Sequence, residues 1–116
     1  MIIVALAIAV CSPPPAHRVT CVVDGDTVWI AREKIRLSNI DAPEMNGKCP
    51  AERALALSAR NRLVQLFAER KITIRREGKD RYGRTLAQLG GVGDQLVRER
   101  LAREWGGRRK GWCGHG

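Results

Sequence analysis

The stretch VVDGDTVWI (residues 22–30) places two aspartates around one glycine, between two apolar runs. An Asp-Gly pair flanked by β-branched residues is typical of a tight β-hairpin turn. We therefore predict two antiparallel strands, over residues 18–23 and 27–31, joined at Asp24, Gly25 and Asp26. The acidic turn stands out because Lys plus Arg outnumber Asp plus Glu 21 to 12, for a formal net charge of +9.

The rest of the chain continues outward from this hairpin. Alternation predicts a third strand over residues 34–40, and leucines and alanines at helical spacing predict a helix over 51–69. Further strands are expected over 71–76 and 84–89, and a final helix over 94–105 with Asp94 as its N-cap. The order β-β-β-α-β-β-α predicts one α+β domain, mainly β, built as a five-stranded OB-type barrel with two helices.

The first 17 residues differ from the remainder. MIIVALAIAV (1–10) is too short to span a bilayer as a helix, and it suits the apolar region of a secretory signal cleaved after Ala9. CSPPPAH (11–17) is typical of an extended linker. An apolar first strand is the alternative, and lipid anchoring at Cys11 is less favoured because Val10 is larger than such a site prefers. We expect an exported protein whose folded domain is residues 18–116, with a short basic C-terminal tail.

Four acidic residues are expected at one end of the barrel. Asp24 and Asp26 flank the hairpin turn, and Asp41 and Glu44 follow the third strand in IDAPE (40–44). Gathered carboxylates repel one another unless a cation joins them, and hard oxygen ligands favour Ca²⁺ or Mg²⁺ over zinc. Each residue taken alone is also consistent with an ordinary turn.

Arginines are expected beside these carboxylates. Arg36 lies on the third predicted strand, and DRYGR (80–84) places Arg81, Tyr82 and Arg84 around a glycine turn. Guanidinium groups match the charge of a phosphodiester and of the state formed when it is attacked. Solvated surface arginine is the alternative. The basic composition by itself indicates a nucleic acid or another polyanion, or only a soluble surface.

These segments together resemble a known family. VVDGDT, IRLSNIDAPE and DRYGR, in this order and around one helix, with Arg100-Leu101-Ala102-Arg103 in place of a GLAR-like segment, resemble the staphylococcal nuclease (thermonuclease) family over residues 18–105. The resemblance implies an OB barrel and a Ca²⁺-dependent nuclease, a phosphodiester hydrolase that cleaves DNA and RNA and leaves 3′-phosphate and 5′-hydroxyl ends.

The resemblance also implies roles for individual residues. Calcium would be held by the Asp26 and Asp41 carboxylates and the backbone carbonyl of Ala42, with Asp24 close behind. Glu44 would activate or orient the attacking water.

The remaining roles concern the substrate. Arg36 and Arg84 would bind the phosphate and stabilise the state formed during attack. Arg81 and Tyr82 would contact a terminal phosphate of a bound nucleotide.

Two departures separate the chain from the family's type member. Glu104-Trp105-Gly106-Gly107 stands where a tyrosine pair lines the base pocket, and a short basic tail with Trp112 replaces a long final helix. The tail can bind a nucleic-acid strand through its positive charge and by stacking of its tryptophan on a base, or it can remain solvated. A non-catalytic OB module that binds single strands and a structural polyanion-binding domain are the alternative functions. Carboxylates repel phosphate, so the acidic cluster favours a nuclease, which we expect to be monomeric and to prefer single strands.

The four cysteines, Cys11, Cys21, Cys49 and Cys113, are too scattered for a zinc motif. They allow three pairings, between which the residues alone do not decide. In the fold that the resemblance implies, the loop of Cys49 and the segment of Cys113 both approach the mouth of the site. This favours Cys11–Cys21 with Cys49–Cys113, in an oxidising compartment. Reduced cysteines in a cytosolic protein are the alternative.

Overall fold

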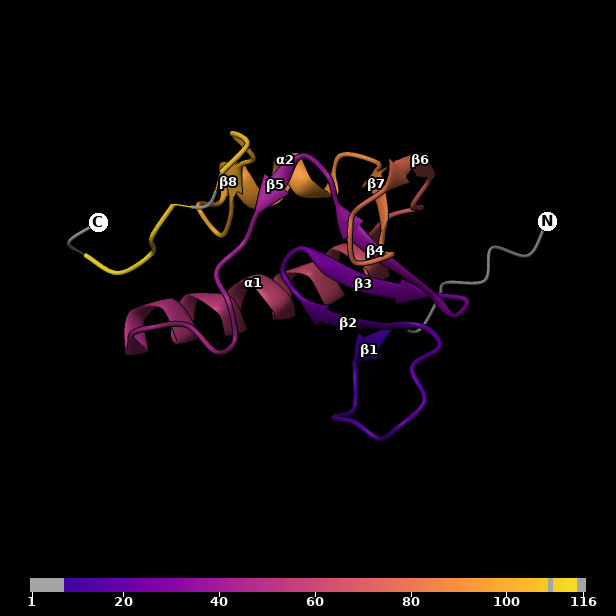
Figure 1. The fold of residues 1–116 in the computed structure, drawn as a ribbon, viewed down its shortest axis with the longest axis horizontal. Helices are drawn as coiled ribbons and strands as arrows, with labels where there is room; N and C mark the ends of the chain where they lie inside the picture. The colour runs from indigo at the N-terminus through magenta and orange to yellow at the C-terminus, as the bar shows by residue number, and fades with distance from the viewer. Residues whose placement is uncertain (1–7, 109, 115–116) are drawn as a thin grey trace.

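The computed structural model describes residues 8–108 and 110–114 as an α+β fold with two helices (Figure 1). The elements in chain order are β1 (Ala9–Val10), β2 (Cys21–Asp24), β3 (Thr27–Ile30), β4 (Glu33–Leu37), β5 (Ile40–Asp41), α1 (Pro50–Glu69), β6 (Ile74–Lys79), β7 (Thr85–Leu89), α2 (Val92–Arg98) and β8 (Arg103–Glu104). The five longer strands and both helices come in the predicted order, which confirms the fold class. β1, β5 and β8 are additional two-residue strands.

The larger sheet has the strand order β1-β2-β3-β4-β7-β6. β2, β3 and β4 form the expected antiparallel meander, and β7 pairs in parallel with β4 through Ile35↔Thr85 and Leu37↔Ala87. Ile35 and Leu37 alternate with polar residues and are fully buried. The core therefore lies on one face of the meander. The hairpin turn after β2 lies at the end of the two strands that it joins.

Helix α1 closes the core from the other side and packs against β2 and α2 (Figure 1). Pro50 begins it, which suits a position whose N–H has no partner within the helix. The predicted apolar stripe is buried at Ala59, Leu63 and Leu66, whereas Leu55 is only partly covered and Ala56 takes its place in the core.

The last predicted helix is wrong in its length. α2 ends at Arg98, because Arg100 adopts a left-handed conformation with φ +61°. The N–H groups of Arg100 and Leu101 bond to the carbonyls of Val97 (3.0 Å) and Leu96 (2.9 Å), which is the Schellman pattern of a helix end.

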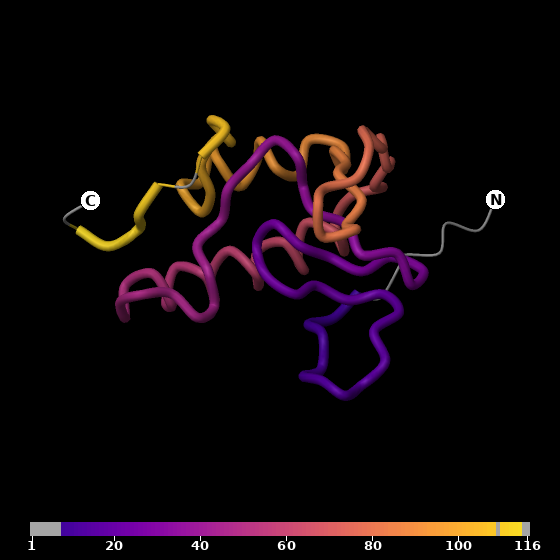
Figure 2. The backbone as a smooth tube through the Cα atoms, in the orientation of Figure 1, coloured from indigo at the N-terminus to yellow at the C-terminus, as the bar shows by residue number. Residues whose placement is uncertain are grey.

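The chain beyond α2 turns back along the site. β8 pairs with β5, and the Trp105 N–H bonds to the Asn39 carbonyl at 3.0 Å. Asp94 is not the N-cap either: Gly91 holds that position, and Asp94 accepts a hydrogen bond from Asn39 Nδ2 at 3.3 Å. Figure 2 shows that the connection from β5 to α1 and the C-terminal segment run along the same side of the molecule, as the disulfide between them requires.

The N-terminal part of the described chain is attached to the sheet. Ile8 is buried in the core, β1 pairs in parallel with β2, and a Cys11–Cys21 disulfide closes the proline-rich loop. The second disulfide joins Cys49 to Cys113, so both bonds follow the favoured pairing. Residues 1–7 of the signal-like segment lie outside the described residues, and cleavage after Ala9 stays a prediction. None of the described helices has the length and apolar character needed to cross a membrane.

Candidate active site

The hairpin turn between β2 and β3 is set deep in the molecule by its glycine. A Cβ atom at Gly25 would lie 2.9 Å from the Cβ atoms of both Ala42 and Ala59. Glycine therefore lets the turn contact the segment after β5 and helix α1 at the same time. This approach brings the aspartates on either side of Gly25 to the residues of IDAPE.

Asp26 contacts two other segments of the site. Its side chain is buried, and its Oδ2 accepts a hydrogen bond from the Ala42 N–H at 3.0 Å. Its Oδ1 accepts one from Thr27 Oγ1 at 3.1 Å, and Arg36 Nη2 lies 3.7 Å from Oδ2. One carboxylate thus contacts the segment after β5 and an arginine of β4.

Asp24 and Asp41 complete the acidic group. Asp24 Oδ1 accepts the Asp26 N–H at 3.1 Å. Burial, together with the negative charge of Asp26, raises the pKa of Asp24 to about 7. Asp41, on β5, is only 3 % exposed and is paired in register with Arg103 of β8. The acidic group is therefore poorly solvated.

The donors here suit a hard cation. Asp26 and Asp41 carry buried carboxylate oxygens, the kind of ligand that hard cations prefer, and the pKa of Asp24 is raised by burial and then by the charge of Asp26. Among residues 8–108 and 110–114, no three His, Cys, Asp or Glu side chains are placed to hold a metal ion. A cation at this position would depend on two carboxylates and the backbone oxygen of Ala42.

The arginines lie together in a pocket of about 530 Å³, which we call the arginine pocket. Its lining residues are Arg36, Ser38, Asp80, Arg81, Tyr82, Arg84, Leu86 and Trp105. All four substrate-contacting residues expected from the sequence are among them.

Asp80 orients Arg84 within the arginine pocket. Its Oδ2 lies 2.6 Å from Arg84 Nε, and its Oδ1 accepts the N–H groups of Tyr82 and Arg84 at 2.9 Å each. Burial alone would raise the pKa of Asp80, but the hydrogen bonds from Arg84 and Tyr82 lower it below its usual value. The turn DRYGR is thus built around an ionised aspartate.

Arg36 is held on the other side of the same pocket. Its Nη1 donates to the carbonyls of Leu37 and Ile40, the latter at 3.1 Å, and its guanidinium lies 5.3 Å from the centre of the Trp105 ring. An aromatic residue therefore does line the pocket, although the family's tyrosine pair is missing. Trp105 follows β8, which pairs with β5 after α2 has ended at Arg98, and lies in the lining of this pocket.

Glu44 lies outside the lining of the arginine pocket. It is exposed and belongs to a second pocket, near Cys113, so the structure does not gather every predicted site residue in one cavity. Asp26 lines neither pocket, but it contacts Arg36, from the arginine pocket, and the N–H of Ala42, two residues before Glu44 in the chain.

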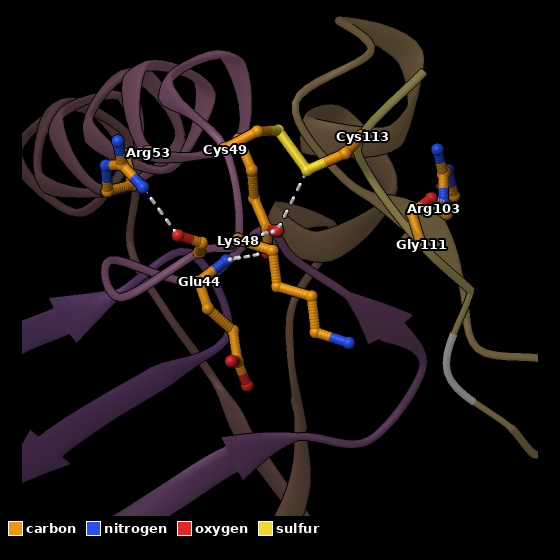
Figure 3. Close-up of a disulfide and its surroundings, with 9 residues drawn as sticks. Glu44, Lys48, Cys49, Arg53, Arg103, Gly111 and Cys113 are labelled. Atoms are coloured by element: carbon orange, nitrogen blue, oxygen red, sulfur yellow. Dashed lines mark hydrogen bonds between the residues drawn. A yellow bond between two sulfur atoms is a disulfide. The ribbon is translucent and has the colours of Figure 1, made fainter. Parts of the chain in front are cut away.

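Glu52 fixes the segment that carries Glu44, and it was not predicted from the sequence. This buried carboxylate in the first turn of α1 accepts the N–H of Glu44 through Oε2 (3.0 Å) and that of Lys48 through Oε1 (3.1 Å). Arg53 Nη1 also donates to the Gly47 carbonyl at 2.8 Å. Figure 3 shows Glu44 and Lys48 extending their side chains in the same direction, away from the disulfide. The glutamate three residues after Cys49 was a usable signal, since such a residue often reaches back over a helix start.

The geometry agrees with comparison to known proteins. Residues 34–107 match the model of the family described as "Staphylococcal nuclease homologue". The chain belongs to this family. The match runs from β4 through β8 and so includes Arg36, Asp41, Glu44 and Arg84.

Several relatives are similar over parts of their length. The chain is 32% identical over 95 residues to a protein named "Thermonuclease" from Staphylococcus intermedius, covering 77% of this chain and 56% of that protein. It is 32% identical over 94 residues to one named "Uncharacterized endonuclease" from Haemophilus influenzae (73% and 49%). It is 38% identical over 73 residues to "Succinoglycan biosynthesis protein ExoI" from Rhizobium meliloti (54% and 36%). The chain thus spans between 36% and 56% of the length of these relatives.

Proposed function

We propose that the protein is a metal-dependent nuclease that hydrolyses phosphodiester bonds in DNA and RNA. The observation that carries the proposal is the position of Asp26, whose one carboxylate contacts Arg36 and the backbone of Ala42; we assign Arg36 to phosphate binding. Acidic residues that would hold a cation and arginines that would hold a phosphate therefore adjoin. The family match and the names of two relatives support the same reaction.

Ca²⁺ is the proposed cofactor. Asp26 and Asp41 would hold it through carboxylate oxygens and Ala42 through its carbonyl, with Asp24 beside them. When bound, such a cation acts as a Lewis acid and as a template for the phosphate. The purely oxygen donor set favours Ca²⁺ over zinc, and the flexible coordination of Ca²⁺ suits a site without a complete carboxylate cage.

The other side chains of the site have separate roles in the hydrolysis. Glu44, exposed on its fixed segment, orients a water and accepts its proton as the water oxygen attacks phosphorus. The bond from phosphorus to the 5′-oxygen breaks, and that oxygen takes a proton from solvent, which leaves a 3′-phosphate and a 5′-hydroxyl. Arg36 and Arg84 neutralise the charge that builds on the phosphate oxygens. Arg81 and Tyr82 contact a neighbouring phosphate.

The buried carboxylates argue against a module that only binds single strands. Asp26 and Asp41 would repel a phosphate and contribute nothing to its binding. We also propose that the protein is exported and acts as a monomer with a preference for single strands. Two disulfides support export, since such bonds persist in oxidising compartments.

Variants of residues with different proposed roles test this mechanism. Glu44→Gln should lower kcat by about 10²–10⁴-fold and leave the Kd for a single-stranded oligonucleotide within about twofold, because a general base acts on the chemical step. Arg84→Ala should lower kcat more than it weakens binding, since its charge is matched to the transition state.

The matched control is Arg75→Ala. Arg75 is an exposed arginine on β6 that does not line the arginine pocket, so this variant should cleave like the wild-type protein. Full activity in Glu44→Gln would remove Glu44 from the mechanism, even if the protein is a nuclease.

A further inference from the structure

A second cavity, of about 420 Å³, is lined by Glu44 and by no other residue of the proposed chemistry. We call it the tail pocket. Its lining residues are Glu44, Asn46, Gly47, Lys48, Glu52, Lys110, Gly111, Trp112 and Cys113. Residues 44–48 form one wall and residues 110–113, from the C-terminal tail, form the other.

The tail wall is held in place by several independent contacts. The Cys49–Cys113 disulfide ties it to the start of α1, where Cys113 Sγ also lies 3.8 Å from Glu52 Oε1 (Figure 3). Arg103 Nη1 donates to the Gly111 carbonyl at 2.8 Å, and the Arg103 guanidinium lies 3.7 Å from the centre of the Trp112 ring. The pocket is therefore a built feature of the fold.

The chemistry of the tail pocket matches a nucleic-acid strand. Lys48 and Lys110 are exposed cations, one on each wall, and can each neutralise a phosphate. Trp112 lines the same cavity and carries an indole, the kind of ring on which a base can stack, and the Arg103 guanidinium lies 3.7 Å from the centre of this ring. Because Glu44 lines this cavity too, a strand whose scissile phosphate lies at Glu44 can extend into the cavity.

Resting on the proposed function, we infer that the tail pocket is a second substrate subsite, which binds a nucleotide next to the scissile phosphate on the side away from the arginine pocket. Trp112 stacks on its base, and Lys48 and Lys110 contact its phosphates. The substrate is then a strand long enough to occupy both pockets, and the tail sets this preference.

Binding of oligothymidylates of increasing length tests the inference. Affinities are measured in Ca²⁺ with a Glu44→Gln background, from a dinucleotide to about 16 nucleotides, which covers the usual site sizes of an OB fold. Trp112→Ala should weaken binding of the longest strand about tenfold, as expected for the loss of one base stack, and change the dinucleotide affinity less than about twofold. Lys110→Gln should reduce the slope of log Kd against log salt by about 0.7.

Three variants make the result specific. Trp29→Ala removes a tryptophan that lines a different cavity, and Lys71→Gln an exposed lysine outside the tail pocket; neither should change binding. Trp112→Phe keeps an aromatic ring and should retain most of the affinity. Unchanged long-strand binding in Trp112→Ala, or an equal loss at every length, would overturn the subsite.

The proposed function and the subsite can fail separately. If the wild-type protein proves unable to cleave, the same series is measured on it without the Glu44→Gln change. A length-dependent loss in Trp112→Ala then supports a binding subsite on a non-hydrolytic protein. Normal cleavage together with no effect of Trp112→Ala at any length keeps the nuclease and rejects the subsite.

Discussion

Replacing Gly25 by alanine tests how the acidic turn is positioned. The new Cβ would lie 2.9 Å from the Cβ atoms of Ala42 and Ala59, closer than the 3.5–4.0 Å at which carbon atoms attract. The turn, the segment after β5 and helix α1 must then separate by about 0.5–1 Å, and overpacking of this kind costs about 1–3 kcal/mol. In a domain of this size that should lower Tm by about 4–12 °C, measured by thermal unfolding monitored by circular dichroism.

Gly91→Ala is the matched control for steric crowding, because its Cβ would approach only Arg70 Nη1, at 3.8 Å; as a change at the N-cap of α2 it should lower the Tm less than Gly25→Ala does. Adding Ala59→Gly to Gly25→Ala should recover part of the lost stability, although glycine in a helix costs about 1 kcal/mol by itself. A Tm of Gly25→Ala no lower than that of Gly91→Ala would contradict steric crowding at the turn. So would an Ala59→Gly change that destabilises the wild-type protein and the Gly25→Ala variant equally.

Three further changes concern stability away from the turn. Replacing both Cys49 and Cys113 by serine should reduce the free energy of unfolding by about 4 kcal/mol in the chain-entropy model, given their sequence separation of 64, and a urea midpoint equal to wild type would contradict it. Arg100→Gly should stabilise the end of α2 by about 0.5 kcal/mol, since glycine adopts φ +61° without strain; a lower Tm would speak against this. Hydrogen bonds from Arg76 and then Thr85 lower the pKa of Glu33 to about 2, so its stabilisation is complete above the ordinary value of 4.5 and disappears as the pH falls through about 2. Glu33→Gln should therefore unfold more easily than wild type at neutral pH and equally easily near pH 2, and a difference that persists at low pH would exclude this origin.

The elements that the sequence predicts well are those with a strong local pattern. The Asp24-Gly25-Asp26 turn, the alternation at Ile35 and Leu37, and the long apolar stripe of α1 each impose one arrangement by their own periodicity. The end of α2 could not be predicted from a local pattern of this kind. An arginine at position 100 gives no sign of a left-handed residue, whereas a glycine there would have indicated a helix end.

The site was predictable where the residues belong to contiguous motifs. Arg36, Arg81, Tyr82 and Arg84 were expected near one another and share a pocket. Trp105 reaches that pocket only because β8 pairs with β5, a two-residue ladder without periodicity. The tail wall depends on the Cys49–Cys113 bond between segments 64 residues apart in sequence, which local patterns do not encode and which only the family resemblance led us to expect.

The roles assigned to the site residues stay predictions, and one measurement tests them most directly. The purified protein is incubated with single-stranded DNA in Ca²⁺ and, separately, in excess chelator, and the products are resolved by length and end group. Because Asp26, Asp41 and Ala42 are proposed to hold the cation against the phosphate, we predict cleavage to 3′-phosphate ends in Ca²⁺ and none with the chelator, with Mg²⁺ a poor substitute because of its stricter octahedral geometry. Strand binding without cleavage in Ca²⁺, or equal cleavage with the chelator present, would contradict the account.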